Sequence, residues 1–313
     1  MKVLITGIAG FAGSHLAELA LREGAEVVGT VLPDAPVDNL ATLGKDVATV
    51  ACDLTEPGAA AAVVQATRPD RVFHLAGASV VGTSWALRTD VLRTNLEATY
   101  QLCEGLRRHP VPCLLVSSGE VYGDVPESEQ PISEARRWAP SSPYALSKAS
   151  QELYAGYYAR AEGLRLVIVR AFNHVGPRQG LGFVWSDVAR QIAEIERGRE
   201  PAILEVGTTT TRRDFTDVRD MVRAYWLLLA RGDLGTYNAA SGTATSIQEV
   251  IDAFRAHATK PIEMRQVAQR VRPVDVPMLV GDASRLRALT GWTPRIPLEQ
   301  SIEDVLDDWR RRI

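Results

Sequence analysis

The chain is poor in cysteine and lacks any apolar run of about 20 residues, the length that a membrane-spanning helix needs. Its three cysteines, Cys52, Cys103 and Cys113, stand in apolar surroundings without CxxC spacing, so we predict reduced core residues and no disulfide framework. Gly7 and Gly10 interrupt the N-terminal apolar run too early for a signal peptide. From these absences we expect a cytoplasmic protein, and the sequence shows no metal-ligand pattern.

The chain also lacks an excess of charge of either sign. It has 35 Lys and Arg against 38 Asp and Glu, a formal net charge of −3. This balance gives no electrostatic case for nucleic acid or an anionic membrane as a partner. A hydrophobic fraction of 46% in 313 residues is ample for a large buried core, in one domain or two.

A glycine-rich turn lies between a predicted strand and a predicted helix near the N-terminus. Residues 3–6 are apolar or β-branched, as in a strand buried on both faces, and a helical apolar pattern follows over residues 15–21. Between them, Gly7, Gly10 and Gly13 permit a tight turn, close approach to a pyrophosphate and close packing of helix on strand. The helix N-terminus then offers N–H groups to phosphates. In this context the GxxGxxG spacing predicts dinucleotide binding.

Predicted strands and helices alternate through the first half of the chain. The further strands are predicted at residues 26–31, 47–50, 71–75, 112–116 and 167–169, and the longest helix between them at residues 96–106. The alternation predicts an α/β fold, a Rossmann-type doubly wound parallel sheet. Because ligands bind beyond the carboxyl ends of such strands, we expect Gly7, Ala76 and Ser118 at one site.

The sequence leaves the cofactor preference open. The end of the second strand usually carries an acid for the ribose hydroxyls of NAD or an Arg for the 2′-phosphate of NADP. Residues 30–34 carry neither in place, since Asp34 comes a few residues late and no Arg is near. Asp53, after the third strand, has two interpretations: an acceptor for the adenine amino group, or the cap of a helix. The prediction is therefore NADP or NAD.

Tyr144 and Lys148 are four residues apart in a predicted helix that has Pro143 in its first turn. This spacing puts both side chains on one face, about one turn apart. A nearby ammonium favours the phenolate and lowers the pKa of a tyrosine from its usual value of about 10. Such a pair can move a proton to or from a carbonyl or an alcohol. The same spacing also occurs in ordinary amphipathic helices, so its weight depends on the rest of the chain.

After the sixth predicted strand the pattern changes to shorter elements, beginning with a polar, turn-rich segment at residues 173–180. Residues 212–218 and 272–276 carry arginines, which either hold a diphosphate or form surface ion pairs. We expect a smaller C-terminal substrate-binding domain beside the nucleotide-binding one. The predicted NAD(P)-binding domain is residues 1–166 and roughly 208–240, and the predicted nucleotide-sugar domain is roughly residues 167–207 and 241–313.

Together these motifs resemble the extended short-chain dehydrogenases/reductases that act on nucleotide sugars, over essentially the whole chain. The matching residues are Thr6, Gly7, Gly10, Gly13, His74 to Gly77, Asn95, Ser118, Tyr144, Lys148 and the Asn173 segment. Within that family, residues 172–177, 182–184, 213–220 and 272–275 resemble the GDP-mannose branch. Its members include reductases of GDP-4-keto-6-deoxy-D-mannose and GDP-mannose 4,6-dehydratases.

The resemblance implies roles for these residues. Ser118 and Tyr144 would hydrogen-bond the C4 oxygen of the sugar, and Tyr144 would pass the proton. Lys148 would bind the nicotinamide ribose and lower the pKa of Tyr144. The implied cofactor-binding residues are Gly7, Gly10, Phe11, Gly13, Asp53, Leu54, Leu75, Ala76, Gly77, Asn95, Tyr144 and Lys148. For a GDP-linked 6-deoxyhexose, the implied substrate-binding residues are Asn173, Val184, Arg213, Arg272 and Asp275.

Glu120 bears on the type of reaction. In dehydratases of the family, a Glu two residues after a strand-end Thr removes the C5 proton, as an elimination requires. This chain has Ser118 in place of that Thr but keeps Glu120, which is either a base or a structural acceptor. The resemblance favours a reductase that makes GDP-D-rhamnose, with a dehydratase that uses Glu120 as the alternative. A 4-epimerase fits less well, because such enzymes usually lack the carboxylate.

A non-catalytic dinucleotide sensor of the same fold is a further hypothesis. Such proteins usually lose the Tyr or the Lys, and this chain keeps both, so the enzyme hypothesis is preferred. The resemblance also implies a homodimer formed through the long helices around residues 96–106 and 144–158. The Tyr and Ala content of these helices suits such an interface, but equally suits burial inside one chain.

Overall fold

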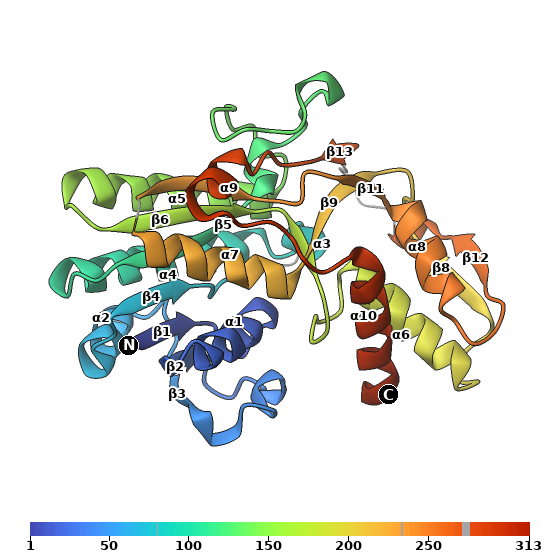
Figure 1. Cartoon of the computed structure of the whole chain (residues 1–313), viewed down its shortest axis with the longest axis horizontal. Coiled ribbons are helices and arrows are strands. Elements are labelled where there is room, and N and C mark those ends of the chain that lie inside the picture. Colours follow the sequence, from blue (N-terminus) through green and yellow to red (C-terminus); the bar gives the residue numbers. More distant parts are fainter. Residues whose placement is uncertain (80, 233, 271–275) are drawn as a thin grey trace.

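A parallel sheet forms the centre of the larger part of the molecule in the computed structural model, which describes residues 1–79, 81–232, 234–270 and 276–313 (Figure 1). Its strands are β1 (Lys2–Thr6), β2 (Glu26–Val31), β3 (Val47–Ala51), β4 (Arg71–His74), β5 (Cys113–Ser118), β6 (Leu166–Ala171) and β10 (Gly235–Ala239). They lie in the order β10-β6-β5-β4-β1-β2-β3, and every neighbouring pair is parallel. The predicted Rossmann-type sheet is therefore confirmed.

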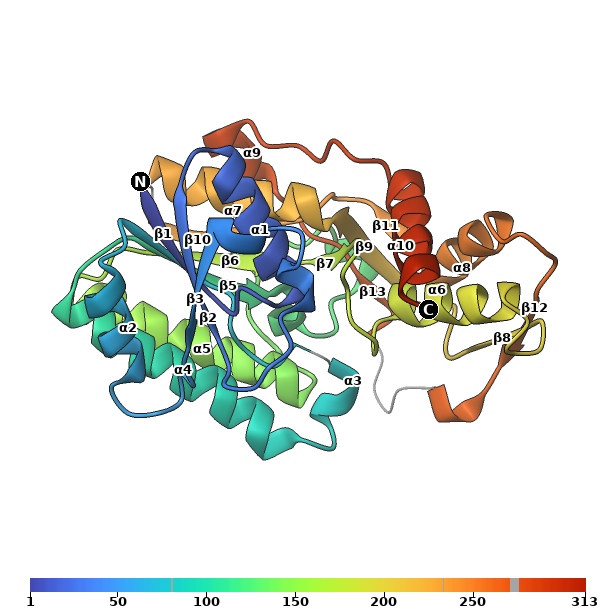
Figure 2. The same ribbon diagram turned by 90° about the horizontal axis from the view of Figure 1, so that it is seen from below.

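Helices cover both faces of this sheet (Figure 2). One face carries α1 (Phe11–Arg22), α7 (Val218–Arg231) and α9 (Ser284–Thr290), and the other carries α2 (Ala59–Thr67), α4 (Arg88–Arg108) and α5 (Pro143–Ala161). Successive strand residues point to opposite faces, so Val3 and Ile5 pack in the first layer and Leu4 in the second. Such two-sided burial explains the continuous apolar runs in the sequence.

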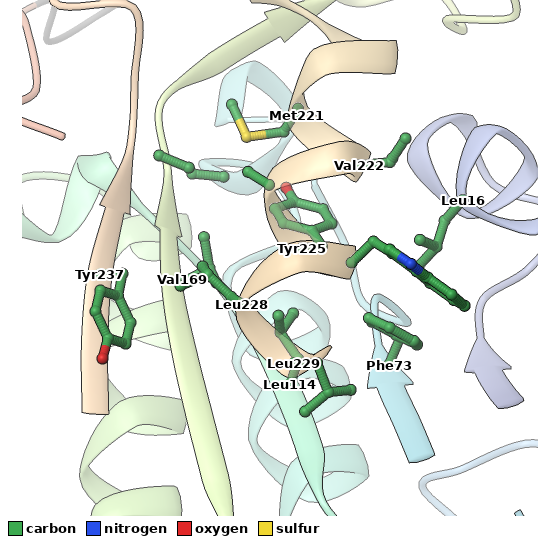
Figure 3. Close-up of a cluster of buried hydrophobic side chains, with 14 of the residues drawn as sticks. Leu16, Phe73, Leu114, Val169, Met221, Val222, Tyr225, Leu228, Leu229 and Tyr237 are labelled. Atoms are coloured by element: carbon green, nitrogen blue, oxygen red, sulfur yellow. The ribbon is translucent and has the colours of Figure 1, made fainter. Parts of the chain in front are cut away.

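Figure 3 shows how α7 packs on the sheet. Met221, Tyr225 and Leu228 recur at helical spacing and lie buried over the strands, near Leu114 and Val169. The side chain of Asp217 caps the N-terminus of α7 by accepting from the N–H of Arg219, and Gly232 ends the helix in the left-handed region.

A smaller part of the chain forms its own core beside the large sheet, on the right of Figure 1. There β9 (Arg212–Asp217) pairs with β7 (Asn173–Val175) and β13 (Met278–Leu279) in parallel and with β11 (Ala244–Ser246) antiparallel, and β8 (Ile203–Val206) pairs with β12 (Glu263–Gln266). The helices are α6 (Val184–Glu196), α8 (Ile247–Ala256) and α10 (Leu298–Arg312). Trp185 fills this core, with its ring 5.4 Å from that of Phe215 and 5.3 Å from that of Phe254.

The remaining elements are short. They are α3 (Val81–Ser84) and the 3₁₀ helices η1 (Asp38–Leu40), η2 (Gly44–Asp46), η3 (Gly119–Tyr122), η4 (Glu127–Glu129) and η5 (Ala268–Arg270). Within the ranges that the structure describes, no helix is both long and apolar enough to cross a membrane.

The predicted domain boundaries need two corrections. The boundary at residue 166 separates β6 from the sheet to which it belongs, because β6 is hydrogen-bonded to β5 and β10 and buried along its length. Conversely, β9 lies in the range 208–240 that we assigned to the nucleotide-binding domain, but its hydrogen bonds go to β7, β11 and β13. The chain thus passes to the second sheet after residue 171 and returns with α7.

We predict that Gly13→Ala destabilises the protein. A Cβ at Gly13 would lie 2.3 Å from the carbonyl oxygen of Gly7 and 2.9 Å from the Cα of Ile8, closer than real Cβ atoms come. Overpacking of this kind lowers the free energy of unfolding by about 1–3 kcal/mol, measurable by denaturant unfolding. Gly180→Ala is the control, because a Cβ there meets no heavy atom within 4 Å. Equal effects of the two substitutions would contradict the prediction.

Candidate active site

A cavity of about 620 Å³ lies at the C-terminal edge of the large sheet. The cavity is lined by residues at or just beyond the ends of the strands of this sheet, namely Gly7, Leu32, Asp53, Leu75, Ser118 and Phe172. It extends to the second sheet, where Asn173, Phe183 and Leu279 line it. Open parallel sheets bind ligands at this edge, at the point where the strand order reverses. Here that point is beside β1, because β2 and β3 follow it on one side and β4, β5 and β6 on the other.

The structure brings most of the predicted site residues to this one cavity. Those that line it are Gly7, Gly10, Phe11, Gly13, Asp53, Leu54, Leu75, Ala76, Gly77, Ser118, Glu120, Tyr144, Lys148 and Asn173. Their positions agree with the prediction, and their roles stay predictions.

The first glycine of the turn, Gly7, stands at a position that only glycine can occupy without strain. Gly7 has a φ of 69°, in the left-handed region, and a Cβ there would lie 2.9 Å from the Cα of Ala76. Gly10 is the N-cap of α1, and no side chain caps this helix end. The first N–H groups of α1 therefore remain available beside a lined cavity, which is the chemistry that holds a pyrophosphate. The residues present fit a dinucleotide.

The end of the cavity beyond β2 and β3 is mostly apolar. Val31, Leu32, Ala35 and Pro36 line it, and Asp53 is its charged residue within the part of the chain that the structure describes. Asp34 is exposed and lies outside the lining. This end therefore offers no arginine to a 2′-phosphate and no acid after β2 to ribose hydroxyls, and the cofactor preference remains open.

Asp53 does not cap a helix, contrary to one of its two interpretations. Its Oδ1 accepts from the backbone N–H of Thr55 at 2.9 Å and from the hydroxyl of Thr55 at 2.8 Å, which closes a turn. Helix α2 begins at Ala59, six residues after Asp53, and its N-cap residue is Gly58. The carboxylate also lines the cavity, so its predicted contact with adenine stays a prediction.

Asn95 does not line the cavity itself, and its predicted role in cofactor binding stays a prediction. It is fully buried, its Oδ1 accepts from the N–H of Ala78 at 2.8 Å, and its Nδ2 donates to the hydroxyl of Ser147 at 2.8 Å. A Cβ at Gly77 would meet this Oδ1 at 2.5 Å. Asn95 therefore ties the loop after β4 to α5 and shapes the cavity wall from behind.

Ser118, Tyr144 and Lys148 meet where β5 ends and α5 begins. Ser142 caps α5 by accepting from the N–H of Ala145 at 3.0 Å, which fixes the first turn that carries Tyr144. The hydroxyl of Ser118 lies close enough to the phenol of Tyr144 to act on its pKa. The Nζ of Lys148 lies 5.9 Å from the centre of the Tyr144 ring and donates to the carbonyl of Val116 at 3.0 Å.

Burial dominates the electrostatics of this group. It raises the pKa of Tyr144 to about 12, against the opposing effect of the Ser118 hydroxyl, and the charge of Glu120 raises it further. Burial also lowers the pKa of Lys148 to about 8, although the charge of Glu152 opposes this. Desolvation of the phenolate thus sets the direction of the shift in the pKa of Tyr144, and the lowering expected from Lys148 stays a prediction. Tyr144 is a proton donor at neutral pH.

A buried ion pair that the sequence analysis missed holds α5 against the sheet. The guanidinium of Arg170 on β6 donates to both carboxylate oxygens of Glu152, the shortest bond being 2.8 Å, and the side chains are 5% and 2% exposed. The hydroxyl of Ser117 donates to the same carboxylate at 2.5 Å. Glu152 stands one turn after Lys148, a spacing that could have identified it.

Glu120 follows Ser118 at the start of η3. Its backbone N–H donates to the Ser118 hydroxyl at 3.2 Å, and its half-buried side chain lines the cavity. Its charge acts on the pKa of Tyr144, so the carboxylate is near the phenol. Its role as a base or as an acceptor stays a prediction.

The predicted substrate-binding residues agree least with the lining of the cavity. Val184 begins α6 and Phe183 lines the cavity in its place. Arg213 is buried away from the lining, where its Nη1 donates to the carbonyl of Val276 at 2.7 Å. The predicted residues Arg272 and Asp275 lie outside the described residues.

Sequence reasoning did not identify the other cavity residues of the segment after β6. They are Phe172, His174 and Gln179, and the ring of His174 stacks on that of Phe11 at 5.7 Å. Burial lowers the pKa of His174, which keeps the ring neutral. This stack joins the glycine turn to the substrate segment, and no spacing in the sequence signals it.

Comparison with known proteins gives one family. The family model described as GDP-mannose 4,6 dehydratase matches residues 4–305. The chain is 34% identical to the GDP-6-deoxy-D-mannose reductase of Pseudomonas aeruginosa, over 100% of this chain and 98% of that protein. It is 29% identical to GDP-mannose 4,6 dehydratase 2 of Arabidopsis thaliana, over 97% and 86%.

The chain is also similar over its full length to solved structures. One is the structure of RMD from Pseudomonas aeruginosa complexed with NADPH, with a TM-score of 0.84, 33% identity and coverage of 100% and 99% of the two chains. Another is a Thermus thermophilus UDP-glucose 4-epimerase complex with NAD, with a TM-score of 0.88, 31% identity and complete coverage of both chains.

We predict that one lysine titrates near pH 8. The pKa of Lys148 is lowered by burial to about 8, so its ammonium loses its proton there. The sequence contains only Lys2, Lys45, Lys148 and Lys260, so isotope-labelled lysine gives few NMR signals. The signal that moves near pH 8 should be missing in Lys148→Arg. If that variant keeps the moving signal, the assignment to Lys148 is wrong.

Proposed function

The chain belongs to the GDP-mannose 4,6-dehydratase family of extended short-chain dehydrogenases/reductases, and we propose that it reduces the C4 ketone of GDP-4-keto-6-deoxy-D-mannose to GDP-D-rhamnose with NAD(P)H. The sequence-based assignment to this family is confirmed. The observation that carries the proposed reaction is the cavity in which a protonated Tyr144 stands beside Ser118 and Lys148. The full-length similarity to a GDP-6-deoxy-D-mannose reductase supports the substrate.

The geometry suits proton donation to a ketone. A bound reduced nicotinamide supplies the hydride. Ser118 and Tyr144 orient the C4 oxygen, and Tyr144 gives its phenolic proton to that oxygen as negative charge develops there. The raised pKa of Tyr144 keeps the proton in place until such a base is present. The cation of Lys148 then stabilises the phenolate, and it is available below the lysine pKa of about 8.

Either nicotinamide cofactor is compatible with the site. The structural relatives named above are complexes with NADPH and with NAD, and the adenosine end of this cavity carries no charged side chain after β2 that selects between them. Catalytic roles for Ser118, Tyr144 and Lys148 and a binding role for Asn173 are part of the proposal.

A dehydratase is the second candidate, and a specific observation favours it. Glu120 lines the cavity close enough to act on the pKa of Tyr144, so a carboxylate stands beside the reacting group. In a dehydratase, Glu120 would take the C5 proton of a 4-keto intermediate. The family description also names that activity.

We further propose that the enzyme is a cytoplasmic homodimer. Leu146, Leu153, Tyr154 and Tyr157 form an exposed apolar stripe along α5, and Tyr100 of α4 packs on Tyr154 with ring centres 6.1 Å apart. Such a stripe on two long helices suits pairing with the same helices of a second chain. Free Cys52, Cys103 and Cys113 suit a reducing compartment.

The decisive assay mixes the protein with GDP-4-keto-6-deoxy-D-mannose and NADPH or NADH. We expect loss of the absorbance of the reduced cofactor, matched by formation of a GDP-6-deoxyhexose. Tyr144→Phe should lower kcat by about 100-fold or more, because general acid catalysis contributes at least that much. Turnover of GDP-mannose without any reductant, abolished in Glu120→Gln, would instead establish the dehydratase.

Leu153→Asp should convert the dimer to a monomer. Leu153 is 61% exposed in the single chain, and a charge at the centre of an apolar contact is strongly unfavourable. Light scattering of the wild type and the variant measures the change. The control is Leu181→Asp, a leucine of similar exposure (50%) in the segment before α6. A wild-type monomer would refute the proposed interface.

A further inference from the structure

The hydroxyl of Tyr225 on α7 has no hydrogen-bond partner among the residues that the structure describes. The side chain is fully buried. Figure 3 shows the ring between α7 and the strands, with the oxygen toward the edge at which the strand arrows end. Tyr225 also lines the active-site cavity. The unpartnered donor thus belongs to a residue of the cavity wall.

A second buried tyrosine, Tyr122, has a hydroxyl that is fully hydrogen-bonded within the protein. Tyr122 is 1% exposed, its hydroxyl donates to the Oδ1 of Asn238 at 2.7 Å, and it accepts from the Nη1 of Arg170 at 2.8 Å. Buried polar groups are nearly always paired in this way, because an unpaired one forfeits its hydration. A donor left unpaired at a cavity wall therefore points to a partner that arrives with a ligand.

The position of Tyr225 narrows the choice of ligand. Burial raises the pKa of Tyr225 and the charge of Tyr144 raises it further, so the two phenols are near each other and Tyr225 stays a neutral donor. The two approach the cavity from different layers, since α5 covers one face of the sheet and α7 the other. The sugar C4 oxygen is already served by Tyr144 and Ser118. The layer that contains α7 also contains α1, the helix after the glycine turn that would hold the pyrophosphate of the cofactor.

We propose that the hydroxyl of Tyr225 donates a hydrogen bond to the carboxamide oxygen of the bound nicotinamide. The carboxamide is the hydrogen-bonding group of that ring, and the partner of a neutral donor must be an acceptor. The hydrogen bond would fix the rotation of the ring beside Tyr144. The proposal rests on the proposed function only in requiring a nicotinamide cofactor, whichever sugar is the substrate.

The test is Tyr225→Phe, which removes one oxygen and keeps the ring. Calorimetric titration with NADH should show binding weakened by about five- to tenfold, the effect of one hydrogen bond. ADP-ribose, which lacks nicotinamide, should bind equally well to variant and wild type. Free of ligand, the variant should melt about 2 °C higher, because an unpaired buried donor has been removed. If the wild type binds NADPH more tightly than NADH, the titrations use NADPH and 2′-phospho-ADP-ribose in place of NADH and ADP-ribose.

Tyr122→Phe is the matched control. It should lower the melting temperature, since Arg170 and Asn238 lose a partner, and leave the ratio of NADH to ADP-ribose affinity unchanged. Unchanged NADH affinity in Tyr225→Phe would overturn the proposal. So would an equal loss for ADP-ribose, which indicates general distortion, or a lower melting temperature, which indicates a hydroxyl already paired in the free protein. Because binding is measured without a sugar, failure of the reductase assay leaves this test readable.

Discussion

The buried ion pair between Glu152 and Arg170 fixes the helix on which the candidate chemistry depends. Burying two charges is costly and is offset only when the geometry is good and the remaining polar atoms are satisfied. Both conditions hold here, because the guanidinium contacts both carboxylate oxygens, Ser117 donates to the same carboxylate, and Arg170 also donates to Tyr122. The pair joins α5 to β5 and β6 one turn from Lys148. It thereby sets the distance between Tyr144 and the end of β5, where Ser118 lies.

The same low-dielectric surroundings decide the protonation of the site. Desolvation raises the pKa of Tyr144 and lowers that of Lys148, so it favours the neutral form of both. Glu152 opposes this effect for Lys148 alone, since its charge raises the lysine pKa. The result near neutral pH is a protonated phenol beside a charged ammonium. That combination suits the donation of a proton to a ketone better than its removal from an alcohol.

The sequence was sufficient for the features that arise from local pattern. The first six strands of the large sheet, the glycine turn and the Tyr144–Lys148 spacing follow from periodicity and steric need within a few residues, and the structure places them as expected, whereas β10 was not predicted. Features that depend on distant partners did not follow. Asn95 bonds Ser147, 52 residues away, and Arg213 bonds Val276, 63 residues away, and no local pattern signals either contact. The apolar pattern of α7 likewise predicts that Tyr225 faces the core but not that it lines a cavity.

The two sheets are connected through a short stretch that also positions α7. Asp214 on β9 accepts from the N–H groups of Ser241 and Gly242, which ties β9 to the loop after β10. Three residues later, Asp217 caps α7 and accepts from the hydroxyl of Ser301 on α10. The start of α7 is therefore fixed by the second core, while its body packs on the large sheet. Since Tyr225 stands two turns along this helix, the substrate-side core also helps to fix the position of Tyr225 in the cavity wall.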